Sequence, residues 1–381
     1  MRRPILSVST LLGWRNLAHE RLRLIVTVVG IVFAVLLMSL LLSLLLGFAT
    51  TTAGLIDHAN ADLWICARGT RNVDQAVEIP ARWRYKAFEN PDVIEAENYI
   101  VRFALLRRPD GGSESIILIG LNVDSGLGAP WNLVQGSVWD LKRPDAIIVD
   151  QLYKEKLGIT QAGQVVEVNG HRARVVGFTH RVRTFVQSPY VFASFNTAGA
   201  LGLLDGNTTT YVLVKLRPNA DVNRVKQWLQ KRMPAAAIYD RAEFARSTQW
   251  YWLLATGAGM ALIFAAVLGL IIGVVITAQT LYASAMDHLP EYATLRAMGA
   301  PSGYLNAIII KQALMTAIFG YAIGISLSLA VVQASRDANT AMLLPWQVAI
   351  GLGFVTMVMC VLAGMVAIRR VLAVNPTSAF R

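Results

Sequence analysis

The residues that most often carry catalysis or metal binding are few and scattered in this sequence. Its five histidines, at positions 19, 58, 171, 180 and 288, form no HExxH pair. A GxSxG nucleophile elbow and a GxxxxGK[ST] phosphate loop are both absent, so neither a hydrolase nor this route to ATP hydrolysis is supported. Cys66 has no Cys or His at metal-ligand spacing. We therefore predict no catalytic residue, metal or cofactor on this chain.

Residues 287–305 form a polar stretch between two long apolar runs, and their pattern indicates docking onto a partner. Pro290 suits a first helical turn, and Gly299 followed by Pro301 is a helix stop. A short amphipathic helix of this kind fits a groove on a soluble partner, whereas the alternative is a solvated cytoplasmic loop. The candidate docking residues are Glu291, Tyr292, Leu295, Arg296, Met298 and Gly299.

The composition predicts a membrane protein, because 55% of the 381 residues are hydrophobic and only 15% are charged. The membrane helices must therefore position this polar stretch. Of the net charge of +11, the region 57–246 carries +4 and the remainder carries +7. Basic residues therefore gather beside the apolar runs, as the positive-inside rule describes. Binding to nucleic acid is disfavoured, and contact with membrane lipids is expected.

Four apolar runs predict four transmembrane helices. The first is too long for a signal peptide, which has an apolar core of about 7 to 15 residues. Arginines before the first run and after the last place both termini in the cytoplasm. The aromatic residues 250–252 suit an outer aromatic belt before the second span. The predicted membrane segments are 24–56 and 247–282, both with stalk extensions, 304–333 and 346–368.

The remaining segments complete an α-helical membrane protein with a large α+β extracytoplasmic domain, 57–246, between its first two spans. They are a cytoplasmic interfacial helix at 1–23, the docking segment at 283–303, a short periplasmic loop at 334–345 and a cytoplasmic tail at 369–381. Two glycine pairs have the small-xxx-small spacing that lets helices approach closely, Gly269 with Gly273 and Gly320 with Gly324. Packing within one chain and contact in a dimer are equally open.

Turn residues predict a folded domain in the region 57–246. Strands flank residues 109–112, and a second hairpin is predicted around Asn169 and Gly170, a strong type I′ signal. Residues 146–157 read as a strand that runs into a helix. A β-α-β unit is predicted over 210–239, with Asp221 as the cap of its helix.

Several segments carry a resemblance to known permeases. They are LLGWRNLAHERLRL, AIIVDQLYKEKLGI, VNGHRARVVGF, the most specific one, DHLPEYATLRAMG, and RRVLAVNPTSAF. The chain resembles the MacB, LolC/LolE and FtsX group, and within it the DevC family. The resemblance implies that the docking segment is a coupling helix seated in a separate ATPase subunit. It also implies two extracytoplasmic subdomains, one β-rich and one α/β.

The resemblance further implies a homodimer in the bacterial inner membrane, working with two copies of an ABC ATPase that holds the ATP and Mg²⁺. Substrate such as glycolipid would be exported through a periplasmic adaptor, or membrane fusion protein, and a TolC-like outer-membrane channel. Two alternatives stay open. One is an FtsX-like mechanotransmitter that activates a cell-wall hydrolase, and the other is lipoprotein release of the LolC/LolE type.

Overall fold

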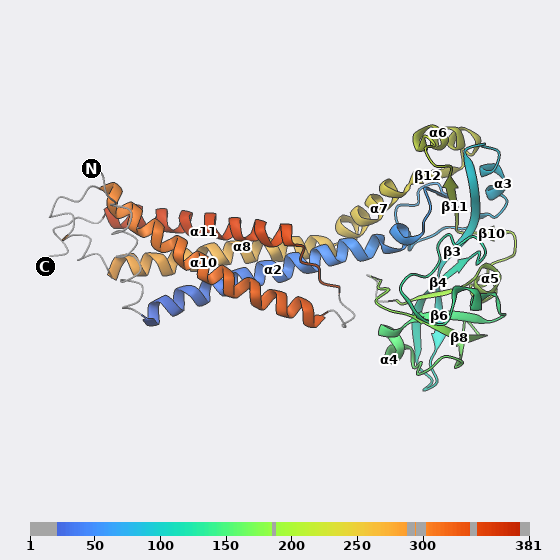
Figure 1. The fold of residues 1–381 in the computed structure, drawn as a ribbon, viewed down its shortest axis with the longest axis horizontal. Helices are drawn as coiled ribbons and strands as arrows, with labels where there is room; N and C mark the ends of the chain where they lie inside the picture. The colour runs from blue at the N-terminus through green and yellow to red at the C-terminus, as the bar shows by residue number, and fades with distance from the viewer. Residues whose placement is uncertain (1–20, 185–187, 288–293, 295–301, 336–340, 374–381) are drawn as a thin grey trace. The chain divides into compact units, whose positions relative to one another are not determined.

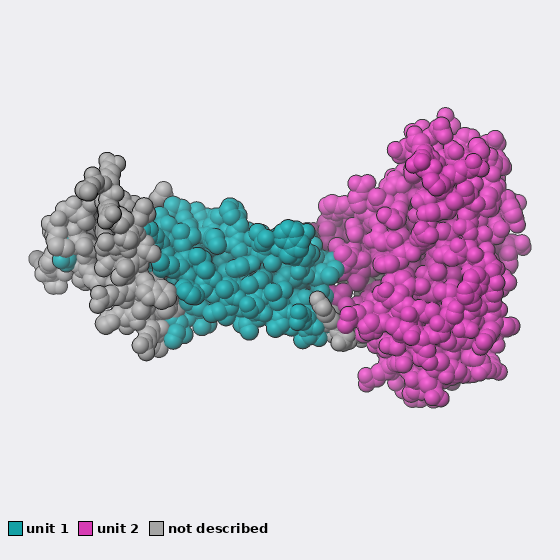
Figure 2. Space-filling model, viewed as in Figure 1, with its two compact units in different colours: residues 1–46, 261–336, 342–381 teal, residues 47–260, 337–341 magenta. Residues whose placement is uncertain are grey.

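The structure is a computed structural model that describes residues 21–184, 188–287, 294, 302–335 and 341–373. It divides into two compact units (Figure 2). The helical unit comprises residues 1–46, 261–336 and 342–381. The sheet unit comprises residues 47–260 and 337–341.

Four long helices dominate the helical unit (Figure 1). They are α2 (Arg21–His58), α8 (Ala258–Asp287), α10 (Ser302–Ala334) and α11 (Trp346–Ala373). In the described part of the chain, each contains a segment of 20 residues or more that is apolar enough to cross a membrane. The four predicted spans are therefore confirmed, although α11 continues five residues into the predicted tail, to Ala373.

Side chains of α2 lie at the centre of the helical unit. Ile31 and Val35 are fully buried and pack with Ala313 and Ala317 of α10 and with Cys360 of α11. Small partners let the helix axes approach, which is how helices gain packing energy where lipid supplies no hydrophobic drive. Large apolar side chains elsewhere on α8 and α11 are exposed, as a lipid-facing surface requires; they include Phe264, Ile271, Ile350 and Phe354.

In the described part of the sheet unit, ten strands form one sheet. Their order is β12-β1-β11-β3-β4-β9-β6-β8-β5, and β7 pairs with both β3 and β8. The path from β3 round to β7 therefore closes into a ring. The strands are β1 (Leu63–Ala67), β3 (Val93–Arg107), β4 (Ser113–Leu121), β5 (Leu133–Gln135), β6 (Ala146–Asp150), β7 (Val165–Val168), β8 (His171–Thr179), β9 (Tyr190–Ser194), β11 (Tyr211–Leu216) and β12 (Ala236–Asp240). The short β2 (Ile79–Pro80) and β10 (Thr208–Thr209) pair separately.

Strand β3 joins the two halves of the sheet because it is 15 residues long. Its first part, from Val93 to Tyr99, pairs with β11, and its second part, from Ile100 to Arg107, pairs with β4. The half that contains β11 packs against α3 (Trp83–Ala87) and α6 (Val222–Arg232). The half that contains β4 packs against α4 (Lys154–Leu157) and α5 (Phe195–Leu201).

The turns predicted for the sheet unit are confirmed. Asn169 and Gly170 both have positive φ, 48° and 82°, as a type I′ turn requires, and they join the antiparallel strands β7 and β8. Strand β6 runs through a 3₁₀ turn, η2 (Gln151–Tyr153), into α4. Asp221 caps α6 by accepting from the amides of Asn223 and Arg224. Strand β1 lies between β11 and β12, so the β-α-β unit is split rather than adjacent.

The second stalk helix differs from the prediction. A single helix is predicted over 247–282, whereas the structure has an interruption within this range. Helix α7 (Arg241–Trp250) passes into a π-helical turn, η3 (Tyr251–Ala255), and α8 starts only after Gly257. Gly257 has a φ of 74°, a left-handed conformation that glycine adopts without steric cost. π-Turns contain an extra residue per turn and commonly mark functional positions.

Candidate functional site

The predicted coupling residues lie outside the described part of the chain. They are Glu291, Tyr292, Leu295, Arg296, Met298 and Gly299. The structure describes α8 up to Asp287, a helical Thr294, and α10 from Ser302. The coupling helix therefore stays a prediction from the sequence.

Both predicted glycine pairs face α2 of the same chain. A β-carbon added to Gly273 on α8 would lie 2.7 Å from the Ala34 β-carbon, and one added to Gly269 would clash with Leu37. On α10, a β-carbon at Gly320 would lie 2.5 Å from Cγ2 of Ile31. The fourth glycine, Gly324, meets Val35 in the same way. These glycines thus let α8 and α10 pack closely against α2.

A buried polar contact joins α2 and α10. The hydroxyls of Ser39 and Ser328 lie 2.5 Å apart, and both residues are fully buried. Each hydroxyl also lies within hydrogen-bond distance of a carbonyl of its own helix, Leu36 and Gly324 respectively; because each carries one proton, one hydroxyl donates to its carbonyl while the other donates across the pair. The pair fixes the register of the two helices while leaving no hydroxyl without a partner.

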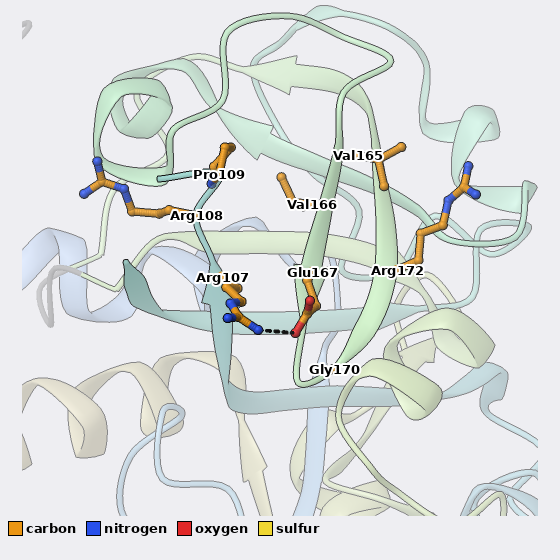
Figure 3. A pocket seen from close by; sticks show the side chains of 8 residues that line it. All are labelled: Arg107, Arg108, Pro109, Val165, Val166, Glu167, Gly170 and Arg172. Carbon is orange, nitrogen blue, oxygen red and sulfur yellow. Dashed lines mark ion pairs between the residues drawn. The ribbon is translucent and has the colours of Figure 1, made fainter. Parts of the chain in front are cut away.

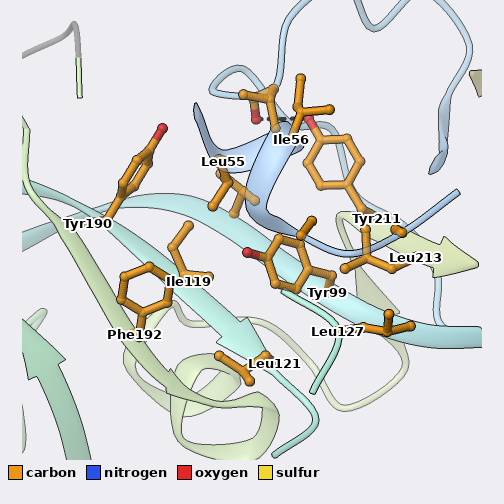
Figure 4. Close-up of a cluster of buried hydrophobic side chains, with 14 of the residues drawn as sticks. Leu55, Ile56, Tyr99, Ile119, Leu121, Leu127, Tyr190, Phe192, Tyr211 and Leu213 are labelled. Carbon is orange, nitrogen blue, oxygen red and sulfur yellow. Dashed lines mark hydrogen bonds between the residues drawn. The ribbon is translucent and has the colours of Figure 1, made fainter. Parts of the chain in front are cut away.

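The C-terminal end of α2 belongs to the core of the sheet unit. Leu55 and Ile56 are fully buried in a cluster that includes Tyr99, Tyr211 and Phe244, and Figure 4 shows Leu55, Ile56, Tyr99 and Tyr211 in it. Burying large apolar side chains of this kind contributes about 1.5 to 3 kcal/mol each. One continuous helix therefore has side chains in the cores of both units.

Helix α7 is anchored in the same cluster. Phe244 stacks on Tyr239 with ring centroids 5.2 Å apart, and it also contacts Trp64. The Gln249 side-chain amide donates to the Ala49 carbonyl of α2 at 2.9 Å. The segments that enter and leave the sheet unit are therefore held together at one place.

The 70–76 loop, between β1 and β2, adds a second attachment. On the core side, the Tyr211 hydroxyl donates to the Val73 carbonyl at 2.9 Å. On the other side, the Tyr251 hydroxyl donates to Oε1 of Gln75 at 3.0 Å, and Nε1 of Trp252 donates to Oδ2 of Asp74 at 3.1 Å. The loop therefore joins the π-helical turn to the core of the sheet unit.

An open pocket of about 550 Å³ lies beside the β7–β8 hairpin. Arg107 and Glu167 point toward one another across it and lie 3.8 Å apart, whereas Arg108 and Arg172 lie on opposite sides (Figure 3). Arg108 is itself paired with Asp110 at 2.5 Å. Because its charges are paired or divergent, the pocket does not assemble a catalytic or anion-binding group. Within the described residues, His, Cys, Asp and Glu form no group of three able to hold a metal ion.

Two family models match this chain. The family model of the MacB-like periplasmic core domain matches residues 24–232, more than half of the chain. That of the FtsX-like permease C-terminal domain matches residues 247–376. The chain belongs to the MacB/FtsX-like permease family. This MacB/FtsX-like permease has the architecture predicted for it, four apolar helices and an α/β periplasmic domain between the first two.

Relatives of this permease include two proteins, each named an uncharacterized ABC transporter permease, from strains CDC 1551 and H37Rv of Mycobacterium tuberculosis. Each is 22% identical over 379 residues, which cover 96% of this chain and 97% of the relative. A similar structure is the periplasmic region of MacB from Actinobacillus actinomycetemcomitans, with 12% identity, a TM-score of 0.38, and coverage of 50% of this chain and 92% of that one. Another is the extracellular domain of the ABC-type transporter YknZ from Gram-positive bacteria, with 16% identity, a TM-score of 0.35, and coverage of 47% and 99%.

Sequence reasoning missed the 70–76 loop of the permease. The sequence predicts only an aromatic belt for residues 250–252, and no pattern in it marks Asp74. The partners of Asp74 are far away in the sequence, Trp252 being 178 residues distant. The one local signal is an acidic residue in a stretch that otherwise reads as a polar turn.

Proposed function

We propose that this MacB/FtsX-like permease is the transmembrane subunit of an ATP-driven ABC exporter and belongs to the DevC branch. It works as a homodimer with two copies of a separate ATPase subunit in the bacterial inner membrane, with both termini in the cytoplasm. An adaptor and a TolC-like outer-membrane channel complete the route for substrate such as glycolipid. Family membership supports the ATPase partner, and the absence of a GxxxxGK[ST] loop from the sequence agrees with it.

The observation that carries the proposal is the continuity of α2. The helix runs without a break from Arg21 to His58, a length of about 57 Å at 1.5 Å per residue. Ile31 and Val35 are fully buried in the N-terminal half of the helix, and Leu55 and Ile56 near its C-terminal end. We infer from this continuity that α2 carries ATP-driven movement at the membrane into the periplasmic domain.

Engagement of the ATPase is tested first. We expect the purified permease to release no phosphate from ATP alone and to gain activity with its cognate ATPase subunit in lipid nanodiscs. Leu295→Asp should abolish both co-purification and stimulated hydrolysis, because it puts a charge into an apolar contact. Truncating such a contact costs about 2 to 5 kcal/mol, and the low end weakens docking more than tenfold.

Leu295→Met is the matched control and should keep wild-type complex yield, since it changes shape but not polarity. Hydrolysis by the permease alone, free of contaminants, would refute the proposal. Wild-type yield and turnover in Leu295→Asp would show that the stretch 287–305 is an ordinary cytoplasmic turn.

A further inference from the structure

Asp74 is a buried acid with an incomplete set of partners. Its residue is only 5% exposed. Oδ2 accepts the hydrogen bond from Nε1 of Trp252, whereas Oδ1 is buried and has no hydrogen-bond partner in the described part of the chain. An ionised carboxylate needs partners for both oxygens when it leaves water, because an uncompensated buried charge is costly.

The groups around this carboxyl do not compensate its charge. They are Tyr190 from β9, Tyr211 from β11 and Trp252 from the π-helical turn, all neutral, and burial raises the pKa of both tyrosines well above the usual value. Arg71, in the same loop, is exposed. Burial therefore raises the pKa of Asp74 from 3.8 to about 6, and the hydrogen bond from Trp252 and the nearby hydroxyl of Tyr190 lower it by less.

The position of the carboxyl gives its protonation a mechanical consequence. The 70–76 loop is held to the core through Val73, which is fully buried, and to α7 through the bond from the Ser247 hydroxyl to the Arg71 carbonyl, 2.8 Å long. Its bonds to Tyr251 and Trp252 are made on the π-helical turn, six and five residues before the left-handed Gly257. Whatever loosens the loop at Asp74 therefore frees the least regular part of the second stalk.

We propose that Asp74 is a proton-binding site that controls how firmly the 70–76 loop holds the π-helical turn. The neutral carboxyl still accepts from Trp252 through one oxygen and leaves no buried charge. The ionised carboxyl favours a conformation in which the loop lifts and water reaches Oδ1. We call the contact of the 70–76 loop with the π-helical turn the latch. Any consequence of this latch for transport rests on the proposed function, whereas the latch itself belongs to the permease chain alone.

The direction of the pH dependence follows from linkage. Because Asp74 binds its proton more tightly when the loop is closed, closure is strongest below a pH near 3.8 and weakens as the pH rises through about 6. These two values predict that closure weakens about tenfold between pH 5 and pH 7.5. Near neutral pH outside the membrane, the latch is then in its looser state.

Hydrogen exchange by mass spectrometry tests this on the full chain in nanodiscs, without an ATPase. Peptides covering 70–76 and 251–255 should lose about tenfold in protection between pH 5 and pH 7.5, after correction for intrinsic rates. Asp74→Asn should stay protected at both pH values, because the amide keeps an acceptor for Trp252 without a charge. Asp124→Asn, at an exposed carboxylate paired with Lys142, is the matched control and should keep the wild-type profile.

A second variant guards against misfolding of Asp74→Asn. Trp252→Phe removes a bond that lowers the pKa of Asp74, so the midpoint of the transition should move to higher pH. A flat wild-type profile, fast exchange in Asp74→Asn at both pH values, or an unmoved midpoint in Trp252→Phe would each overturn the proposal. The proposed function would survive any of these results, because its test depends on the ATPase.

Discussion

At the scale of single residues, the glycines of α8 and α10 show how little space the helical unit leaves. At Gly273 and Gly324, for example, added β-carbons would lie 2.7 Å and 2.9 Å from the β-carbons of Ala34 and Val35. The sequence predicted close helix approach from the spacing of these glycines. It did not identify α2 as the partner, because a small-xxx-small pair marks one face of a helix and carries no information on the opposite surface.

Enlarging one of these glycines tests the packing. We expect Gly273→Val to lower the thermal stability of the permease in detergent, because overpacking a tight contact costs about 1 to 3 kcal/mol. Gly351→Val, on α11, is the matched control, since no atom lies within 4 Å of its added β-carbon. Equal melting temperatures for the two variants would show that the contact with α2 is not tight in the membrane protein.

At the scale of elements, the interruption between α7 and α8 is the main feature that sequence patterns could not locate. Apolar periodicity continues through residues 251–257, and nothing in a single sequence separates an α-helical turn from a π-helical one. The glycine at position 257 is a weak signal alone, because the chain contains 29 glycines. Only the positive φ in the folded chain shows which of them ends a helix.

Replacing this glycine tests whether the left-handed conformation is required. Gly257→Ala should destabilise the permease by about 1 to 2 kcal/mol, because an L-residue pays that much for a left-handed backbone. Gly199→Ala, inside α5 with open space around it, should instead be neutral or stabilising by up to about 1 kcal/mol. Denaturation followed by circular dichroism compares the two, and stabilisation of both would mean that the helix continues through position 257.

Hairpins and capped helices of the sheet unit were predictable because their signals are local. Asn169-Gly170 determines its turn by backbone chemistry, and Asp221 caps α6 with its own side chain. The order of the strands was not predictable, since β4 and β9 pair in parallel although they are about 70 residues apart in sequence. The split of the β-α-β unit by β1 has the same cause.

At the scale of the whole molecule, one helix is shared by two compact units. The chain passes from the helical unit to the sheet unit between residues 46 and 47, within α2, and no loop intervenes. The sequence predicted a stalk from the long apolar run, and the buried positions of Leu55 and Ile56 show how its end is held. In the proposed mechanism, movement of α2 at the membrane moves the core of the periplasmic domain.

Breaking α2 between its buried residues in the two units tests the proposed transmission of movement most directly. Thr51→Pro removes a helical hydrogen bond and clashes with the preceding turn, which kinks or breaks a helix, whereas Thr51→Ala keeps it intact. Spin labels at Gln161→Cys in both protomers of the complex with the ATPase report the separation of the periplasmic domains, since Cys66 and Cys360 are buried. A non-hydrolysable ATP analogue should change that separation in wild type and Thr51→Ala and leave it unchanged in Thr51→Pro, with the ATPase bound equally in all three. The same nucleotide-dependent change in Thr51→Pro would contradict transmission through α2.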